Sequence, residues 1–157
     1  MNRITRILLV VLGLVVLEQA ASAEGRCKEA RGNVVEVFDG KSTATGTLTN
    51  GGWLDGTTVA VFYGPGYPTP DPKEVTFAST FTLTTRHGQL KGTRIYLYDI
   101  VTGQSTIMMK IDPAGGTGIF TGATGLLFFN ELKNTMQTTF YATVGGQVCF
   151  AGQNDDD

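Results

Sequence analysis

Apolar and polar residues alternate along much of this chain with a period of two, which is typical of β-strands that bury one face. The clearest case is the segment 75–85, where the odd positions are mostly apolar and the even positions mostly threonine. No window of a dozen residues keeps the 3.6-residue apolar period of an amphipathic helix. The pattern therefore predicts eight strands, at residues 33–38, 43–49, 57–63, 75–85, 90–100, 105–111, 115–130 and 136–150.

Eight antiparallel strands can form either a sandwich or an up-and-down barrel. A closed barrel pairs the first strand with the last, leaves no edge exposed, and brings Cys27 and Cys149 together. The glycines between residues 115 and 125 would supply the kinks that closure requires. We therefore predict an all-β fold, an eight-stranded antiparallel closed β-barrel, with a long loop at residues 64–72 over one mouth.

The N-terminal segment of the chain has the pattern of an export signal. Arg3 and Arg6 precede an apolar run at residues 7–17, and small residues at 21–23 follow, which is the pattern of a secretory signal peptide. The apolar run is shorter than the roughly 20 residues of a membrane span. We expect a signal peptide at 1–23, one barrel domain at 24–153, a disordered acidic tail at 154–157, no membrane span after cleavage, and a secreted or periplasmic location.

The two cysteines lie near the two ends of the expected domain. In an oxidising compartment their simplest interpretation is a disulfide between Cys27 and Cys149, joining the first and last strands. Loop-closure entropy for such a long loop corresponds to roughly 4–5 kcal/mol of stabilisation. Two lone thiols in a redox or metal site are the alternative. His87 is the only histidine, so the sequence predicts no histidine-rich metal site.

Charge and glycine spacing exclude two classes of partner. Without the signal peptide the chain holds 10 basic and 13 acidic side chains and no basic cluster, so nucleic acid is not an expected partner. The segment around Gly116 and Gly118 lacks the third glycine of a dinucleotide motif, the lysine of a P-loop and a following helix. We therefore expect no phosphate-bearing cofactor at this segment.

The same glycine-rich segment resembles a known family. Its motif holds Gly115, Gly116, Gly118, Gly122 and Gly125 within GGTGIFTGATG, and resembles the signature of dirigent proteins and of allene oxide cyclase-like barrels. A strand of alternating Thr and Phe, a His-Gly hairpin at 87–88 and the ending Gly-Gln-Val-Cys at 146–149 resemble bacterial secreted members of that group. The order of these features along the chain is also similar to theirs.

The resemblance implies a calycin-like barrel with an apolar lumen that works without a cofactor. Its expected partner is a hydrophobic or aromatic small molecule, bound in the lumen by a cofactor-independent cyclase or isomerase or by a stereo-directing protein. The alternative is a non-catalytic exported structural or interaction protein, because an eight-stranded barrel can be filled by its own side chains. An oligomer is compatible with either function, and the motif transfers no catalytic residue.

Two carboxylates are candidates for proton transfer. If the aliphatic face of 90–100, with Ile95 and Leu97, points inward, then Asp99 lies near one rim of the lumen. Asp39 follows Val37 with the same parity at the end of the first strand. A carboxyl group in an apolar pocket has a raised pKa and can donate or accept a proton. The alternative is that both are turn residues, since each stands at a strand end.

Other polar side chains are weaker candidates for a functional site. Tyr63 has the inward parity expected for its strand and could present a phenol to a ligand, although tyrosines are also common at barrel rims. His87 stands in a hairpin with a glycine, where a polar turn residue is expected. Arg94, Tyr96 and Tyr98 share the opposite face of their strand, which we expect to be solvated, with an outer binding stripe as the alternative.

Overall fold

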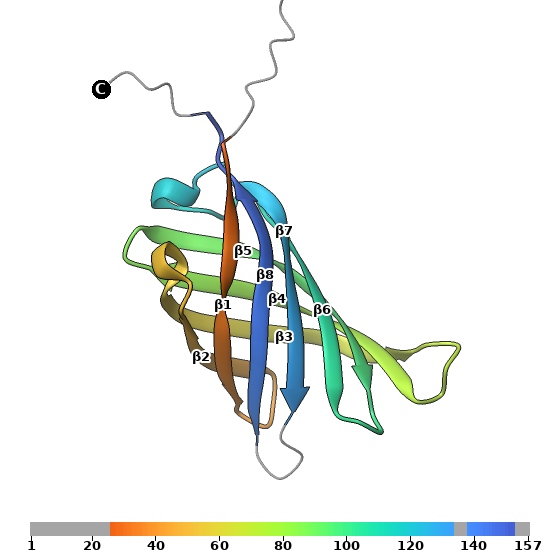
Figure 1. Ribbon diagram of the computed structural model, residues 1–157. Coiled ribbons are helices and arrows are strands. Elements are labelled where there is room, and N and C mark those ends of the chain that lie inside the picture. The colour runs from red at the N-terminus through yellow and green to blue at the C-terminus, as the bar shows by residue number, and fades with distance from the viewer. Residues whose placement is uncertain (1–25, 134–137, 153–157) are drawn as a thin grey trace, which may run out of the picture.

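The chain folds into a closed barrel of eight antiparallel strands (Figure 1). The computed structural model describes residues 26–133 and 138–152. Each strand pairs with its neighbours in sequence, and β8 pairs back with β1. The predicted barrel is therefore confirmed over the sandwich. The signal peptide expected at 1–23 and the acidic tail expected at 154–157 lie outside the described residues.

The strand boundaries agree with the period-two pattern at most positions. The strands are β1 (Cys27–Phe38), β2 (Thr43–Thr49), β3 (Gly56–Pro68), β4 (Glu74–Thr85), β5 (Gly88–Asp99), β6 (Gln104–Ile111), β7 (Thr124–Lys133) and β8 (Thr139–Cys149). β3 continues through part of the segment expected to be a loop, and its register with β4 shifts between Tyr63 and Tyr67. This bulge accommodates the glycines of the segment within a strand. Among the described residues no helix is long and apolar enough to cross a membrane.

The glycine motif is not a strand up to residue 123, which corrects the first part of the strand expected at 115–130, whereas residues 124–130 are a strand as predicted. Gly118 and Gly122 have φ values of 61° and 72°, a left-handed conformation that breaks an extended chain. The segment instead forms turns and a short 3-10 helix, η2 (Gly118–Phe120), and β7 begins only at Thr124. η2 inserts Phe120, which is fully buried, into one end of the barrel.

That end of the lumen is filled by side chains. Besides Phe120 it holds buried residues from the other short helix and from several strands: Leu48, Leu54, Leu83, Leu90, Ile111 and Val148. Leu54 belongs to η1 (Gly52–Leu54), whose Trp53 stacks on Phe120 with ring centroids 5.9 Å apart. The disulfide between Cys27 and Cys149 joins the start of β1 to the end of β8 at the same end, as predicted. The alternative of two lone thiols is therefore wrong.

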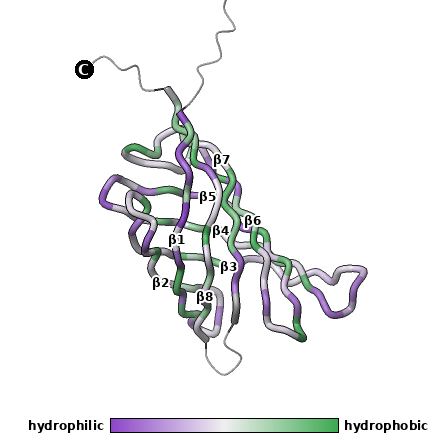
Figure 2. Tube along the Cα trace, viewed as in Figure 1, coloured by the Kyte–Doolittle hydropathy of each residue, from purple (hydrophilic) through white to green (hydrophobic). Residues whose placement is uncertain are grey.

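The structure reverses the predicted orientation of β5. Arg94 and Tyr96 are buried, whereas Ile95 and Leu97 are 50 % and 41 % exposed. The register explains this orientation, because Arg94 pairs with Ser79 of β4, whose neighbours at alternate positions form the core. Valines on the outer faces of β1 and β3 are exposed in the same way, so hydrophobic residues occur on both faces of these strands. Figure 2 shows hydrophobic and hydrophilic positions following one another along the strands.

Candidate functional site

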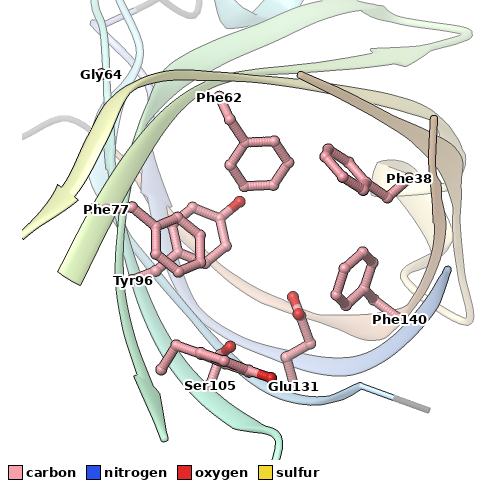
Figure 3. A pocket seen from close by; sticks show the side chains of 10 residues that line it. Phe38, Phe62, Gly64, Phe77, Tyr96, Ser105, Glu131 and Phe140 are labelled. Atoms are coloured by element: carbon pink, nitrogen blue, oxygen red, sulfur yellow. The ribbon is translucent and has the colours of Figure 1, made fainter. Parts of the chain in front are cut away.

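The opposite end of the barrel contains an open pocket of about 290 Å³ (Figure 3). It lies where β1, β5 and β7 end and where β4, β6 and β8 begin. The residues that line it are mainly aromatic: Phe38, Phe62, Gly64, Gly66, Phe77, Tyr96, Tyr98, Ser105, Glu131 and Phe140. Barrel closure brings them together, since the six rings come from five strands and include both β1 and β8.

The rings support one another in a continuous wall. Phe77 and Tyr96 are stacked, with centroids 4.5 Å apart and planes 14° apart. Phe62 tilts against both of these rings at 5.7 Å and 5.4 Å. Phe38 meets Phe62 edge-on at 5.6 Å and Phe140 at 6.4 Å. Stacked and edge-to-face geometries are favourable for aromatic pairs, so the wall is held in place before any ligand binds.

Three polar side chains interrupt this wall. Ser105 and Glu131 face each other across β6 and β7, and both are buried. In Figure 3 the Glu131 carboxylate points into the pocket, between Phe140 and Tyr96. The Tyr96 hydroxyl shares a hydrogen bond of 3.0 Å with Ser79, and burial raises the pKa of its phenol, so it stays neutral near pH 7. Glu131 is the one residue with a carboxyl group among the described lining residues.

A buried ion pair lies deeper in the lumen than the residues that line the pocket. Arg94 Nη1 donates to Glu36 Oε2 at 3.0 Å and to Oε1 at 3.2 Å, and the two side chains are 1 % and 4 % exposed. Each lies two positions deeper on its strand than a lining residue, Arg94 below Tyr96 and Glu36 below Phe38. Because β1 and β5 are four strands apart in a ring of eight, the pair spans the lumen.

Two aromatic rings enclose the guanidinium of this pair. The Arg94 Cζ lies 3.6 Å from the ring centroid of Phe81 and 4.1 Å from that of Phe129. Burial opposes the charge of Arg94, but Glu36 and Tyr96 outweigh it and the pKa of Arg94 is raised. Arg94 therefore remains a cation at every accessible pH, and its layer separates the open pocket from the filled end.

Asp39 is a turn residue and does not face the lumen. Its Oδ1 accepts hydrogen bonds from the backbone N–H groups of Lys41 at 2.8 Å, Ser42 at 3.0 Å and Thr43 at 3.0 Å. These bonds, that from Thr43 foremost, lower the pKa of the carboxyl. Of the two interpretations the turn residue is confirmed and the raised pKa is not, because the group is solvated and hydrogen-bonded rather than enclosed by apolar side chains.

Asp99 and Tyr63 are not brought together with Asp39 either. Asp99 Oδ1 accepts the backbone N–H groups of Val101 at 2.7 Å and Thr102 at 2.9 Å, and these bonds, that from Thr102 first, lower its pKa. Tyr63 is 49 % exposed on the outer face, in a shallow groove beside the β3 bulge. None of these three residues lines the aromatic pocket.

Sequence reasoning missed the polar residues of the lumen. The predicted strand ends at residue 130 and so leaves Glu131 in a turn, although Glu131 continues the period-two pattern of Leu127 and Phe129, which are both buried. Glu36 similarly shares the buried face of Val34, although the valines on the opposite, exposed face of the same strand are more hydrophobic. The alternation itself was therefore the available signal, provided that a charged residue is allowed on the inward face.

The outer face carries an unbroken row of apolar side chains. Tyr63, Ala78, Ile95, Met108 and Phe128 are successive register partners from β3 to β7. All of them except the small Ala78 are at least 40 % exposed. A contiguous apolar surface of this kind is a common mark of a contact with another molecule.

Neither a metal site nor a relative defines the function. Within residues 26–133 and 138–152, no group of three or more His, Cys, Asp or Glu side chains is placed to hold a metal ion. Comparisons with family models, with curated proteins and with solved structures found no match to this chain.

Proposed function

We propose that this protein is an exported barrel that binds a small, largely apolar or aromatic molecule in its open end. The supporting observation is the aromatic pocket of about 290 Å³, in a barrel whose other end is filled. Concave apolar pockets with few polar groups are the usual ligand sites of proteins. The disulfide is compatible with the oxidising compartment that export requires.

The size of the pocket limits the ligand. A volume of about 290 Å³ is at the lower end of the range of small-molecule sites. It suits a molecule of one or two rings, and the surrounding ring faces favour an aromatic body over an aliphatic one. This ligand class agrees with the resemblance to dirigent and allene oxide cyclase-like barrels, which is carried by sequence motifs.

A cofactor-independent cyclisation or isomerisation is a narrower proposal. Such a reaction needs a group that donates or accepts a proton beside the ligand. Glu131 is the one carboxyl group among the described lining residues, so we assign that role to Glu131 instead of Asp39 or Asp99. The neighbouring Ser105 hydroxyl faces it across the strand pair and is a candidate to orient it.

The binding proposal can be tested with a neutral bicyclic probe. We expect 2-naphthol, followed by its fluorescence, to bind the disulfide-bonded protein in a one-to-one complex. Phe62→Ala removes a central ring of the wall and should weaken binding at least several-fold, because it removes ring contacts. Ile95→Ala removes a side chain of the outer face and serves as the control.

Two results would count against the proposal. Binding that Phe62→Ala leaves intact and Ile95→Ala abolishes would place the ligand on the outer face. A folded protein that binds no neutral aromatic molecule at millimolar concentration would favour the alternative of an exported structural or interaction protein.

The outer apolar row supports a second candidate function, contact with another protein surface. Sedimentation velocity of the purified chain would show whether the partner at this surface is a second copy of the chain. Ile95→Lys together with Met108→Lys should shift any oligomer to monomer, whereas Thr143→Lys, at an exposed site off the row, should not. An oligomer that survives the double substitution would mean that the row is not the contact.

A further inference from the structure

The groove beside the β3 bulge lies on the outer apolar row. It has a volume of about 250 Å³, and its lining includes Tyr63, Tyr67, Ala78 and Ile95. Tyr63 and Ile95 are the register partners of Ala78 on its two sides, and they are 49 % and 50 % exposed. These two large side chains therefore flank the single methyl group of Ala78. The hollow between them is of a size that accommodates one aromatic side chain.

The same row carries an aromatic side chain that could occupy such a hollow. Phe128 of β7 is 47 % exposed and is the register partner of Met108 on β6. On its other side Phe128 pairs with Gly145 of β8, where a Cβ would meet nothing within 4 Å. The row thus has a projecting ring on one half and a groove on the other.

The groove and the ring lie at equivalent positions about the middle of the row. Ile95 and Met108 are paired directly, Ala78 is one strand beyond Ile95, and Phe128 is one strand beyond Met108. Because neighbouring strands are about 4.8 Å apart, Ala78 and Phe128 are equally far from the line between β5 and β6. A twofold axis along this line exchanges the two positions.

On the basis of the second candidate function, contact at the outer row, we infer that the partner is a second copy of this chain, related by that twofold axis. Phe128 of each copy lies in the groove at Ala78 of the other copy, and Ile95 lies against Met108. An interface between two identical chains requires this reciprocity of contacts. If the row met itself in the opposite sense, Phe128 would face Phe128 and neither groove would receive a ring.

The residues around these contacts are compatible with the same arrangement. The row from Ala78 to Phe128 carries no charged side chain, and phenylalanine and methionine are enriched in the cores of protein interfaces. At the next outward positions Lys110 pairs with Thr93, so the axis sets Lys110 opposite Thr93 of the second copy. The pairing therefore places no like charges directly opposite each other at these positions.

The arrangement determines how the two barrels are oriented. The axis runs parallel to β5 and β6, so rotation about it leaves the direction of these strands unchanged. The two open pockets consequently face the same side of the dimer. Because the outer face of a barrel is convex, contact is limited to the central strands β4–β7. We expect such a limited contact to form a reversible dimer.

The test exchanges the two side chains that meet. Sedimentation velocity of the disulfide-bonded protein, from micromolar to millimolar concentration, should show a monomer–dimer equilibrium. Phe128→Ala removes the ring from both grooves and should weaken the dimer roughly tenfold or more. Ala78→Phe sets ring against ring and should weaken it similarly. Ala78→Phe combined with Phe128→Ala again places a ring opposite a methyl group in both contacts, and should restore most of the affinity.

Tyr141→Ala is the matched control for the loss of an exposed ring. Tyr141 is 50 % exposed on β8, outside the four strands of the inferred contact. Its substitution should leave the dissociation constant of the dimer unchanged. Thermal unfolding of each variant confirms that it is folded.

The outcomes separate this inference from the function on which it rests. A dimer that Ile95→Lys with Met108→Lys abolishes, but that Phe128→Ala and Ala78→Phe leave intact, would keep the row as the contact and overturn the inferred pairing. Failure of the double exchange to restore the dimer would also overturn it. A chain that is monomeric at millimolar concentration would overturn the inference while contact with a different protein stands. An oligomer that none of these variants weakens would overturn both.

Discussion

At the scale of single residues, the pair of Glu36 and Arg94 is the least expected feature of the lumen. A buried charge is costly unless a partner and suitable surroundings compensate for it. Here the carboxylate takes both hydrogen bonds from Nη1, and the faces of Phe81 and Phe129 cover the guanidinium. A guanidinium is weakly hydrated and stacks on rings, so arginine suits this position better than lysine would.

Removing one member of this pair should destabilise the protein strongly. Glu36→Gln keeps the volume of the side chain but leaves the Arg94 charge without its counter-charge, and should lower the free energy of unfolding by about 3–5 kcal/mol. Equilibrium denaturation in urea measures the change. The matched control is Glu29→Gln in the exposed pair with Arg31, which should leave the midpoint unchanged. Equal effects of the two substitutions would contradict the role assigned to burial.

The turn carboxylates give the stability a defined dependence on pH. The pKa of Asp39 is lowered in the fold, so its contribution is fully present above the ordinary value of 3.8. That contribution is lost as the pH falls through the lower pKa of the folded state, because the unfolded chain then binds the proton more readily. The pKa of Asp99 is also lowered in the fold, so its contribution to stability changes with pH in the same direction.

Asp39→Asn should therefore be less stable than the wild type at pH 6 and approach it as the pH falls below 3.8 and through the lowered pKa of the folded state. Urea midpoints of both proteins across this range provide the measurement. A difference between the two proteins that stays constant down to the lowest pH would show that the carboxylate charge is not involved.

At the scale of the elements, the inward and outward faces of the strands differ less in hydropathy than in a half-buried sheet. β5 exposes Ile95 and Leu97 and buries Arg94, so its more aliphatic face is the outer one. The alternation along a strand identifies which residues share a face but not which face curves inward. The inward side is selected by pairing with neighbours, as with Ser79 opposite Arg94.

The backbones of β1 and β2 approach so closely at Gly46 that a larger residue there should destabilise the fold. A Cβ at Gly46 would overlap the carbonyl oxygen of Val35 and lie 2.7 Å from the Cα of Glu36. Gly46→Ala should lower the free energy of unfolding by about 1–3 kcal/mol, because the backbone of β1 must shift. Gly145→Ala is the matched control, since its Cβ would meet nothing within 4 Å, and it should change stability by no more than about 0.5 kcal/mol. Urea denaturation would show whether the two differ.

At the scale of the whole molecule, the barrel is closed and its two ends differ, because one end is filled by side chains and the other holds a pocket. β1 and β8 pair along most of their length, and the disulfide joins them at the filled end. The packed residues at that end stabilise the fold, which leaves the other end free to enclose a pocket. The glycine motif contributes to this asymmetry, because its turns carry Phe120 into the lumen.

The disulfide should stabilise the closed barrel without being needed to form it. It links residues 122 positions apart, so its removal by Cys27→Ser with Cys149→Ser should lower the free energy of unfolding by about 2–5 kcal/mol. The far-UV circular dichroism should remain that of the native protein, because the backbone pairing of β1 with β8 persists. Urea midpoints that are equal with and without the bond would contradict this expectation.

The sequence by itself determined the β class, the number of strands, most of their boundaries and the pairing of the two cysteines. Each of these properties depends on local periodicity or on the residues at the ends of the barrel. Only the tertiary structure decided which face of β5 points inward, that the glycine motif closes one end, and that Glu131 enters an aromatic pocket. These properties depend on register, curvature and closure, which bring side chains from distant strands into one lumen and which no single segment encodes.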